Sequence, residues 1–398
     1  MPEYGRRPRG VESAFRYQRR FYVCCASNGA RVVSVALRIQ ENQAGFICPF
    51  TLIDRVIMDI ITQGLVGAVV ATSAAGKQHL RLAIGIGFCA GLLADADILI
   101  RAADDPLFNI EYHRHFTHAL LFVPIGGLIA ALLAWPFVRR VLCFGNTYLY
   151  ATLGYLPSGL LDACTSFGTQ LLWPFSDARI AWNLIAIIDP VFSLSLIVAL
   201  LFAWHRRQAW LARLGLGFAL LYLLFGLMQH ERAEEFIAQV AHQRGHVIER
   251  LEVKPTLGNL ILWRAIYETG GHFHIDAVRV GLWSMPRHYP GGTLARFTPQ
   301  ALPNLDPGSV LAGDITRFAR LSDDYLARHP ARPEVLGDAR YAMLPHSTLP
   351  LWGIALDLDH PDRNVRFLTF RHFKQSARRE FLAMLRGRPL PDADGSTD

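Results

Sequence analysis

Apolar residues gather in six runs between residues 60 and 228, and charged residues are concentrated outside them. The runs cover residues 60–75, 80–100, 119–138, 141–161, 184–204 and 209–228. A helix needs about 20 apolar residues to cross a bilayer, and the last four runs reach that length comfortably. The pattern therefore predicts a polytopic helical membrane domain over residues 58–229, with a short first span.

A different texture begins after residue 229, where short alternating segments follow a polar stretch. Residues 230–246 predict a polar-faced helix. ILWRAIYE (261–268) and HFHIDAVRVGLW (272–283) alternate as strands do, with a Thr-Gly-Gly hairpin turn between them. We expect further strands in LWGIALDLD and VRFLTFRHF, and a helix over 318–328. The chain is thus expected to be mainly α, with a smaller soluble α+β domain at residues 230–398.

Residues 1–57 fit neither domain, because they are rich in arginine and contain no long apolar run. The texture changes abruptly at Met58. We interpret the first 57 residues as a disordered or mis-called extension, and the final DADGSTD (392–398) as a frayed end.

Composition supports the membrane assignment. The chain is 52% hydrophobic and only 18% charged, whereas soluble domains carry about 25% charged residues. The net charge of +7 comes almost wholly from arginine, but no basic helix or zinc-finger spacing accompanies it, so no nucleic-acid partner is expected. Six cysteines without a CxxC pair favour neither a thiolate zinc site nor a redox motif.

Basic residues also predict an orientation. Lys77 and Arg81, Arg139 and Arg140, and Arg206 and Arg207 lie in the first, third and fifth loops. These loops share one side of a six-span protein, and the positive-inside tendency makes that side cytoplasmic. The C-terminal domain would then be periplasmic.

The most unusual motif is HRHFTH, residues 113–118, at the mouth of the third run. His113 and His118 lie about 140° apart on a helix, so they converge only if His113 belongs to the preceding turn. Imidazole is a common ligand for zinc and other divalent metals, and Arg114 can clamp a phosphate. The alternative is a polar cap at the membrane interface.

Four carboxylates interrupt, end or precede apolar segments. Asp95 and Asp97 face opposite sides of a helix, so they share a site only where that helix ends, on the same side as the histidines. A carboxylate within a span is costly and usually functional, although a solvated interfacial pair or a transporter relay is an alternative. Asp162 ends the fourth run, one helical turn after Ser158. Asp189 precedes a proline and is expected to cap a helix.

Five segments together resemble a known family. They are MDIITQGLVGA, LLADADILI, HRHFTHALLF, LLDACTSFGTQLLWPFSD and IIDPVF. They are similar to the membrane-bound metal-dependent hydrolases, also described as LexA-binding, inner-membrane-associated hydrolases. The resemblance covers Met58 to about Trp204. It implies a multi-pass protein of the bacterial inner (plasma) membrane that binds a divalent metal and hydrolyses phosphoesters of lipids.

The resemblance also implies roles for single residues. His113 and His118 match the histidines of the family's HR-x-x-TH motif, Asp95 and Asp97 match its Asp-x-Asp, and Asp162 matches the aspartate of a His-x-x-x-Asp element.

Two positions depart from that pattern. Ser158 stands where the His-x-x-x-Asp element has its histidine, and Thr62-Gln63 stands where the first segment often has Thr-His. Either His115 or Asp97 completes the coordination, or the chain is a weakened or inactive relative.

We therefore expect a metal-dependent hydrolase of the phospholipase kind that acts on membrane lipids at the interface. His113, His118, Asp162 and Asp95 would hold the ion, zinc in preference to manganese. Asp97 would be the general base and Arg114 the phosphate-binding residue. The alternative is a non-catalytic inner-membrane protein whose polar cluster is structural and which acts on an envelope protein through its C-terminal domain.

Overall fold

The computed structural model describes residues 49–371 and 375–390, with side chains from residue 61. The expectations for residues 1–48 and for 392–398 lie outside the described residues. Helix α1 (Pro49–Ser73) begins before the boundary expected at Met58, so the backbone of residues 49–57 is helical and continuous with the first apolar run.

Each of the six apolar runs contains at least one helix. The first run belongs to α1, and the others contain α2 (Leu80–Leu93) with the 3-10 turn η1 (Ala94–Leu99), α4 (Val123–Val138), α5 (Phe144–Tyr155) with α6 (Pro157–Cys164), α7 (Pro190–Arg206) and α8 (Ala209–Gln243). Three helical stretches of the described chain are long and apolar enough to cross a membrane, namely Leu80–Leu99, Leu120–Val138 and Ala209–Gln243. Ile61–Ser73 and Pro190–Arg206 are shorter apolar helices.

The fourth run is broken into two helices. Pro157 has no N–H to donate, so the hydrogen-bond ladder is interrupted where α5 ends and α6 begins. A single straight span over 141–161 is therefore replaced by α5 and the short helix α6, which carries Asp162.

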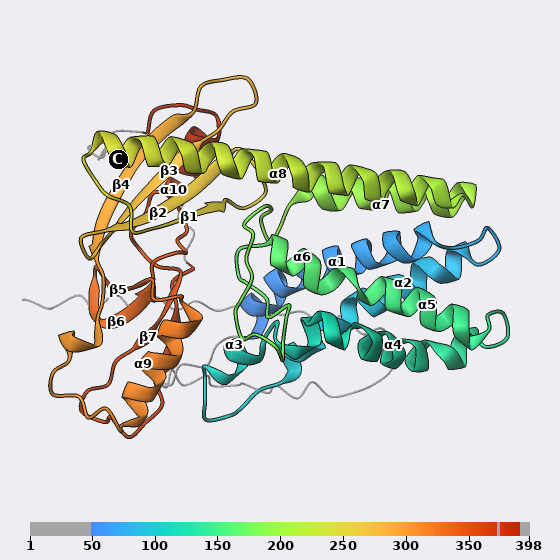
Figure 1. The fold of residues 1–398 in the computed structure, drawn as a ribbon, viewed down its shortest axis with the longest axis horizontal. Coiled ribbons are helices and arrows are strands. Elements are labelled where there is room, and N and C mark those ends of the chain that lie inside the picture. The colour runs from blue at the N-terminus through green and yellow to red at the C-terminus, as the bar shows by residue number, and fades with distance from the viewer. Residues whose placement is uncertain (1–48, 372–374, 391–398) are drawn as a thin grey trace, which may run out of the picture. The chain divides into compact units, whose positions relative to one another are not determined.

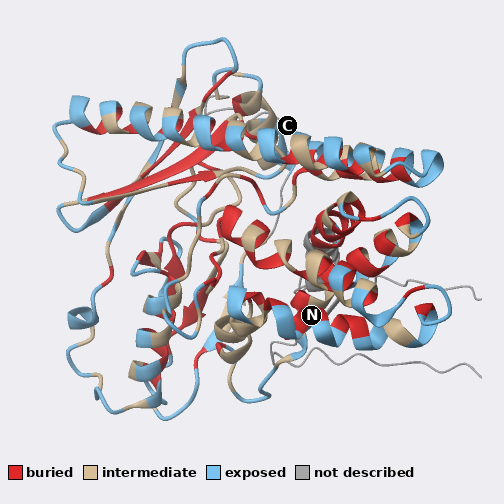
Figure 2. Ribbon diagram, turned by 45° about the vertical axis from the view of Figure 1, so that its right-hand side comes forward, coloured by how far each residue is buried: buried red, intermediate tan, exposed pale blue. Residues whose placement is uncertain are grey.

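The helices of the membrane domain expose apolar side chains outward. In Figure 2 the outer faces of the helices are exposed and their inner faces buried. Large apolar residues such as Leu133, Phe137, Leu201 and Leu221 are exposed, which is the arrangement expected where lipid, not water, covers the surface.

Small residues let α1, α2 and α5 approach closely. A Cβ atom on Gly87 would lie 2.6 Å from the carbonyl oxygen of Gly67, and one on Gly154 would lie 2.6 Å from the Cα atom of Gly87. Helices in a membrane gain no hydrophobic free energy when they associate, because lipid tails are as apolar as their side chains. Close packing through small residues such as glycine therefore drives their association.

The loops that join α1 to α2, α4 to α5 and α7 to α8 lie at one end of the helices, and the C-terminal domain lies at the other (Figure 1). Arg81 stacks over Trp204, and Arg213 donates to the carbonyl of Ser73, so basic residues cluster at the first of these ends. The grouping of the basic loops on one side is confirmed. Which side faces the cytoplasm stays a prediction.

Helix α8 joins the two domains without a break. It is 35 residues long and contains most of the stretch expected as a separate helix at 230–246. The expected boundary at residue 229 therefore falls inside a continuous helix.

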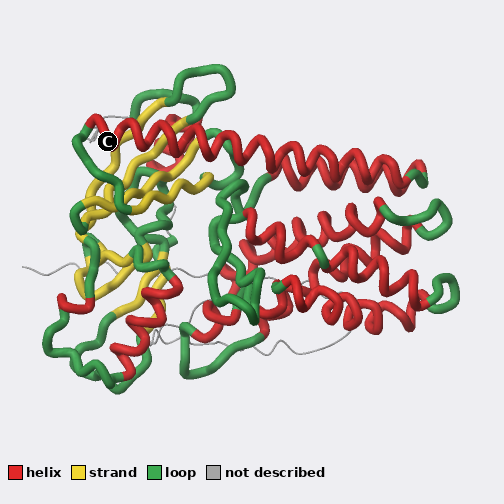
Figure 3. Tube along the Cα trace, viewed as in Figure 1, coloured by secondary structure: helices red, strands yellow, loops and turns green. Residues whose placement is uncertain are grey.

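The C-terminal domain holds two four-stranded antiparallel sheets (Figure 3). The first has the order β1 (Arg250–Pro255), β2 (Leu262–Thr269), β3 (His272–Arg279) and β4 (Arg287–Ala295). The second has the order β5 (Leu326–His329), β6 (Arg332–Asp338), β7 (Trp352–Ala355) and β8 (Arg366–Thr369). The predicted β2–β3 hairpin is confirmed, and Gly270 and Gly271 adopt φ of 56° and 72°, as a two-residue turn requires.

The expected helix at 318–328 was wrong in its bounds. Helix α9 (Val310–Leu321) begins earlier, where the side chain of Ser309 accepts from the amide of Ala312. It ends before Asp323 and Asp324, whose φ of 49° and 56° cannot continue a right-handed helix. The shorter elements are α3 (Phe108–Tyr112), η2 (Phe116–His118), η3 (Leu120–Phe122), η4 (Pro299–Ala301) and α10 (Gln375–Leu385).

Candidate metal centre

The two carboxylates of the Asp-x-Asp motif are buried beside the end of helix α2. The α-helix stops at Leu93, and the tighter turn η1 carries both Asp95 and Asp97. This meets the condition under which residues two apart approach one site, because the regular helix has ended between α2 and the motif.

Asp95, His118 and Asp162 form a buried group. One candidate ligand atom from each residue lies within 4.8 Å of the others. Nε2 of His118 lies 3.4 Å from Oδ1 of Asp95 and 3.1 Å from Oδ2 of Asp162. The three residues come from η1, η2 and α6, so only the packing of these elements brings them together. One imidazole and two carboxylates are a suitable donor set for a divalent transition metal.

Asp97 lies behind His118, on the other side of the imidazole ring. Its Oδ2 is 3.4 Å from Nδ1 of His118. The same oxygen accepts hydrogen bonds from the amide of Arg114 at 2.8 Å and from the hydroxyl of Thr117 at 3.0 Å. A carboxylate in this position orients a histidine so that its second nitrogen faces the ion.

His113 lies beside the group but outside it. It follows α3 and precedes η2, as the convergence of the two histidines required. Its Nδ1 lies 3.0 Å from Oδ1 of Asp97. The structure thus connects His113 to the Asp-His-Asp group through Asp97, which contacts both His113 and His118.

Gln63 is a member of the site that sequence reasoning noticed only as a departure from a motif. It projects from α1, and its Nε2 lies 2.8 Å from Oδ1 of Asp162 and 3.4 Å from Oδ1 of Asp95. The two ends of a side-chain amide are assigned by their hydrogen bonds, so rotating it would present Oε1 to an ion held by the carboxylates. Ser158 is buried nearby and donates to the carbonyl of Gly91 at 3.2 Å.

Four buried polar atoms converge here that make no hydrogen bond of regular geometry within the described residues, although His118 and Asp162 lie at ion-pair distance from each other. They are Oε1 of Gln63, Oδ2 of Asp95, Nε2 of His118 and Oδ2 of Asp162. Buried polar atoms are normally satisfied. Four in one place, three of them on an Asp-His-Asp group, fit a site that takes a cation.

Arg114 contributes positive charge to the same group. It is only 2% exposed, its Nε lies 3.0 Å from Oδ2 of Asp162, and its NH1 donates to Thr165 at 2.8 Å. Its φ of 57° lies in the left-handed region, which residues other than glycine rarely adopt. The guanidinium therefore neutralises part of the charge of Asp162.

The protonation of His118 is linked to the binding of an ion at this site. Burial alone would lower the pKa of its imidazole, but the carboxylates of Asp162, Asp95 and Asp97 outweigh burial and raise the pKa well above its usual range. A metal ligand must be deprotonated. An ion that binds here therefore displaces a proton from His118.

The loop after α6 separates the group from the C-terminal domain. The guanidinium carbons of Arg114 and Arg179 each lie 5.6 Å from the centre of the Phe167 ring. Arg179 in turn donates to the carbonyls of Ile110 and Glu111. Burial lowers the pKa of Arg179 to about 10, which leaves it charged at neutral pH.

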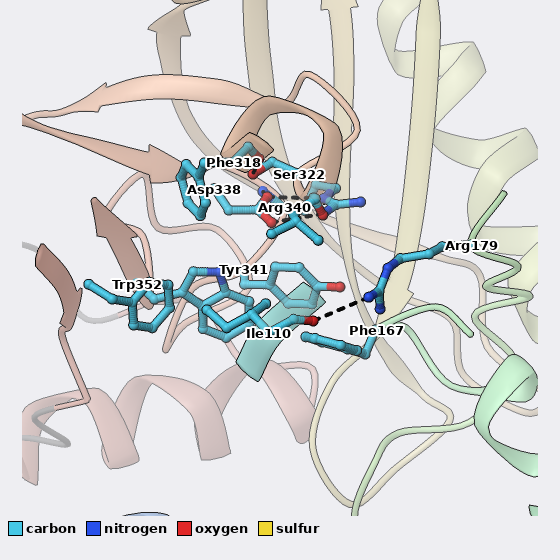
Figure 4. Close-up of a pocket in the computed structure, with 11 residues that line it drawn as sticks. Ile110, Phe167, Arg179, Phe318, Ser322, Asp338, Arg340, Tyr341 and Trp352 are labelled. Carbon is cyan, nitrogen blue, oxygen red and sulfur yellow. Dashed lines mark hydrogen bonds and ion pairs between the residues drawn. The ribbon is translucent and has the colours of Figure 1, made fainter. Parts of the chain in front are cut away.

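A small cavity lies on the far side of Phe167, between this loop and the second sheet (Figure 4). Arg179, Arg340, Tyr341 and Trp352 help to line it. Its volume of ≈ 20 Å³ is enough for water but not for a lipid headgroup. The hydroxyl of Tyr341 donates to the carbonyl of Ser166, so the C-terminal domain is hydrogen-bonded to the loop after α6.

Two other expectations have clear outcomes. Asp189 caps α7 by accepting from the amide of Phe192 at 3.0 Å, and it also accepts from the hydroxyl of Tyr222, so the capping role is confirmed. His115 packs against Tyr112 and Trp173 and is not part of the Asp-His-Asp group.

The fold and this group define a helical membrane protein with a buried Asp-His-Asp cluster. Residues 58–233 match the family model described as YdjM inner membrane protein. No solved structure matches the chain.

Two curated relatives are similar to part of the chain. The chain is 25% identical over 195 residues to the uncharacterized protein YfhP of Bacillus subtilis (strain 168). These residues make up 48% of this chain and 58% of that protein. The chain is 31% identical over 105 residues to the inner membrane protein YbcI of Escherichia coli (strain K12), which covers 25% of this chain and 60% of that protein. The chain thus spans less than two thirds of either relative. The matches and the apolar helices support an inner-membrane location.

Proposed function

We propose that the chain is a metal-dependent hydrolase of the inner membrane that acts on phosphoesters of lipids. The observation that carries the proposal is the buried group of Asp95, His118 and Asp162, whose candidate ligand atoms lie within 4.8 Å of one another. Three ionisable side chains are costly to bury at the edge of an apolar bundle. A bound cation offsets that cost by pairing with the two carboxylates.

The proposed ligands are Nε2 of His118 and one oxygen each of Asp95 and Asp162, with the amide of Gln63 as a fourth group. Asp97 is a positioning residue, because it faces Nδ1 of His118 and already accepts three hydrogen bonds, from Arg114, Thr117 and His113. This differs from the general-base role expected from its sequence. His113 is a positioning residue as well, because its Nδ1 contacts Oδ1 of Asp97.

A divalent ion, zinc or manganese, would polarise a phosphoryl oxygen as a Lewis acid when bound. The residues around it would exclude bulk water, since the three ligands are buried. Arg114 lies 3.0 Å from Asp162 and is directed at the group, not at solvent. Its proposed part is to stabilise negative charge that develops on the substrate beside Asp162.

The site's position favours a substrate that is held in the membrane. Asp95 lies near the end of the apolar stretch Leu80–Leu99, and His118 lies just before the apolar stretch Leu120–Val138. A lipid can present its headgroup there without leaving the bilayer. We further propose that this face and the C-terminal domain are periplasmic, because the basic loops lie at the opposite end of the helices.

One observation favours the rival proposal, a non-catalytic protein whose polar cluster is structural. The buried Arg114–Asp162 pair already neutralises one carboxylate without a metal. Breaking such a pair is strongly destabilising, so its retention does not require catalysis. In that case the C-terminal domain would carry the function by binding an envelope protein.

Metal analysis of the full chain, purified in detergent, separates the two proposals. We expect near-stoichiometric zinc or manganese in the wild type and in His272→Ala, a control that removes an exposed histidine far along the chain. We expect loss of the metal in His118→Ala. A screen of phospholipids and simple phosphoesters, with single metals added back, then tests hydrolysis.

The outcomes are distinct. Metal bound in the wild type and lost in His118→Ala, together with hydrolysis that needs the metal, supports the hydrolase. Wild-type protein without metal, whose thermal stability is unchanged by added zinc or manganese, overturns it and supports the structural cluster.

A further inference from the structure

The connection between β3 and β4, residues 281–286, exposes apolar side chains that no part of the described chain covers. Trp283 is 97% exposed and Met285 is 88% exposed, and Leu282 is also exposed. A soluble protein rarely presents three such residues together on one loop without a partner.

Hydrogen bonds hold this connection at a defined level along α8. Nε2 of Gln229 donates to the carbonyl of Val280 at 2.8 Å, and NH1 of Arg232 donates to the carbonyl of Gly281 at 3.2 Å. Gln229 is buried, so the attachment belongs to the packed part of the domain.

That level is the end of the apolar part of α8. Leu227 and Met228 are the last of its exposed large apolar residues, and the polar residues Gln229 and His230 and the charged residues Glu231 and Arg232 follow. The helix therefore leaves the hydrocarbon region close to Gln229. In Figure 1 the C-terminal domain lies at this end of α7 and α8.

A second attachment places the same sheet at the same level. The amide of Gly258, in the turn between β1 and β2, donates to the carbonyl of Ile188 at 2.9 Å, just before α7 begins. Leu257 in this turn is exposed as well. Two turns of one sheet thus carry apolar residues beside the ends of two apolar helices.

We propose that residues 281–286 insert into the lipid bilayer and seat the C-terminal domain on the membrane surface. Tryptophan favours the boundary between headgroups and acyl chains, because its ring is apolar and its N–H is polar. Leu282 and Met285 add apolar area whose transfer from water is favourable. Arg279 and Arg287 flank the connection, and their guanidinium groups donate to the carbonyls of Leu385 and Gly387. Their positive charge near the connection would still favour a membrane surface that carries anionic lipids.

The test measures the depth of residue 283 in full-length protein reconstituted into nanodiscs. A polarity-sensitive fluorophore is attached to a cysteine that replaces Trp283, in a variant without other reactive cysteines. The matched control carries the same label in place of Val247, which is 79% exposed in the same domain. Val247 follows the end of α8 at Gln243, and Gln243 lies about 20 Å along the helix axis from Gln229 at a rise of about 1.5 Å per residue.

We expect brominated lipid to quench the label at 283 at least about fivefold more strongly than the label at 247, and soluble iodide to show the reverse order. Trp283→Ser is expected to keep the metal content of the wild type, so failure here is distinguishable from failure of the hydrolase proposal. Equal weak quenching of both labels by brominated lipid, with position 283 open to iodide, would overturn the membrane contact. Protection of 283 from both quenchers would also overturn it, and would indicate that protein covers the loop.

Discussion

The carboxylate of Asp97 lies on the opposite side of the His118 ring from the Asp-His-Asp group, with Oδ2 3.4 Å from Nδ1. Nε2, the other ring nitrogen, faces Asp162 at 3.1 Å. One imidazole therefore joins a positioning carboxylate to a candidate ligand set. We expect Asp97→Asn to weaken metal binding by about 10–100-fold, as loss of a partner behind a metal-bound histidine does.

Competition titrations with a chelating dye would measure that change. Asp95→Asn removes a proposed ligand and should cost more affinity than Asp97→Asn. The reverse order would show that Asp97, not Asp95, contacts the ion.

Gln63 offers a change that should strengthen the site. Its amide lies 2.8 Å from Asp162, and an imidazole is a better ligand for zinc than an amide. Gln63→His is expected to raise zinc affinity by about tenfold, or about 1.4 kcal/mol. Gln63→Ala is the paired variant, and zinc binding no tighter in Gln63→His than in Gln63→Ala would refute direct contact between this position and the ion.

Arg114 and the proposed ion share one carboxylate, so their effects should be coupled. Removing the guanidinium in Arg114→Ala leaves Asp162 buried without its ion pair, which costs about 3–5 kcal/mol in comparable cases. We expect the loss in thermal stability to be largest with a chelator and smaller with saturating metal. A loss that is equal with and without metal would mean that no cation binds beside Asp162.

The glycines of α2 allow a stability test with an internal control. In Gly87→Ala the new methyl group would meet the carbonyl oxygen of Gly67 at 2.6 Å, whereas a Cβ on Gly85 has no atom within 4 Å. We expect Gly87→Ala to lower stability by about 1–3 kcal/mol, the usual cost of overpacking. Gly85→Ala should have little effect. Thermal unfolding of both variants in nonionic detergent measures the difference, and similar melting temperatures would contradict the close packing of α1 on α2.

The C-terminal domain should lose stability in acid through Asp276. Burial acts to raise the pKa of this carboxyl, but hydrogen bonds from His288 and Arg244 outweigh it and lower the pKa from 3.8 to about 2. The unfolded state therefore takes up the proton first as the pH falls. The stabilisation, of up to roughly 2 kcal/mol, is present above about pH 4 and is lost as the pH falls toward 2.

Melting temperatures of the wild type and Asp276→Asn at several pH values would check this. Their difference should be largest near neutral pH and shrink below pH 4, while the exposed Asp359→Asn change has little effect at any pH. A difference that stays constant down to pH 2 would exclude the ionised carboxylate as its source.

Local signals were reliable where they depended on near neighbours. The hairpin at Gly270 and Gly271 followed from turn chemistry and alternation, and the cap at Asp189 followed from the proline after it. The predicted helix at 318–328 was wrong because Asp323 and Asp324 adopt left-handed backbone angles, which end the helix at Leu321. The fourth apolar run is hydrophobic enough to predict one span, but Pro157 removes a backbone donor, so the run forms two helices.

Hydropathy and turn propensity are local properties, so the amino-acid order alone specified the apolar helices, the change of texture near residue 229 and the main hairpin. Which polar groups meet is a property of packing. Gln63 and Asp162 are 99 positions apart, and only the contacts of α1, η1, η2 and α6 bring their side chains together. The direction of each side chain depends on where a helix tightens into a 3-10 turn. Because α2 tightens into η1 at Ala94, Asp95 lies beside Nε2 of His118 and Asp97 lies beside Nδ1.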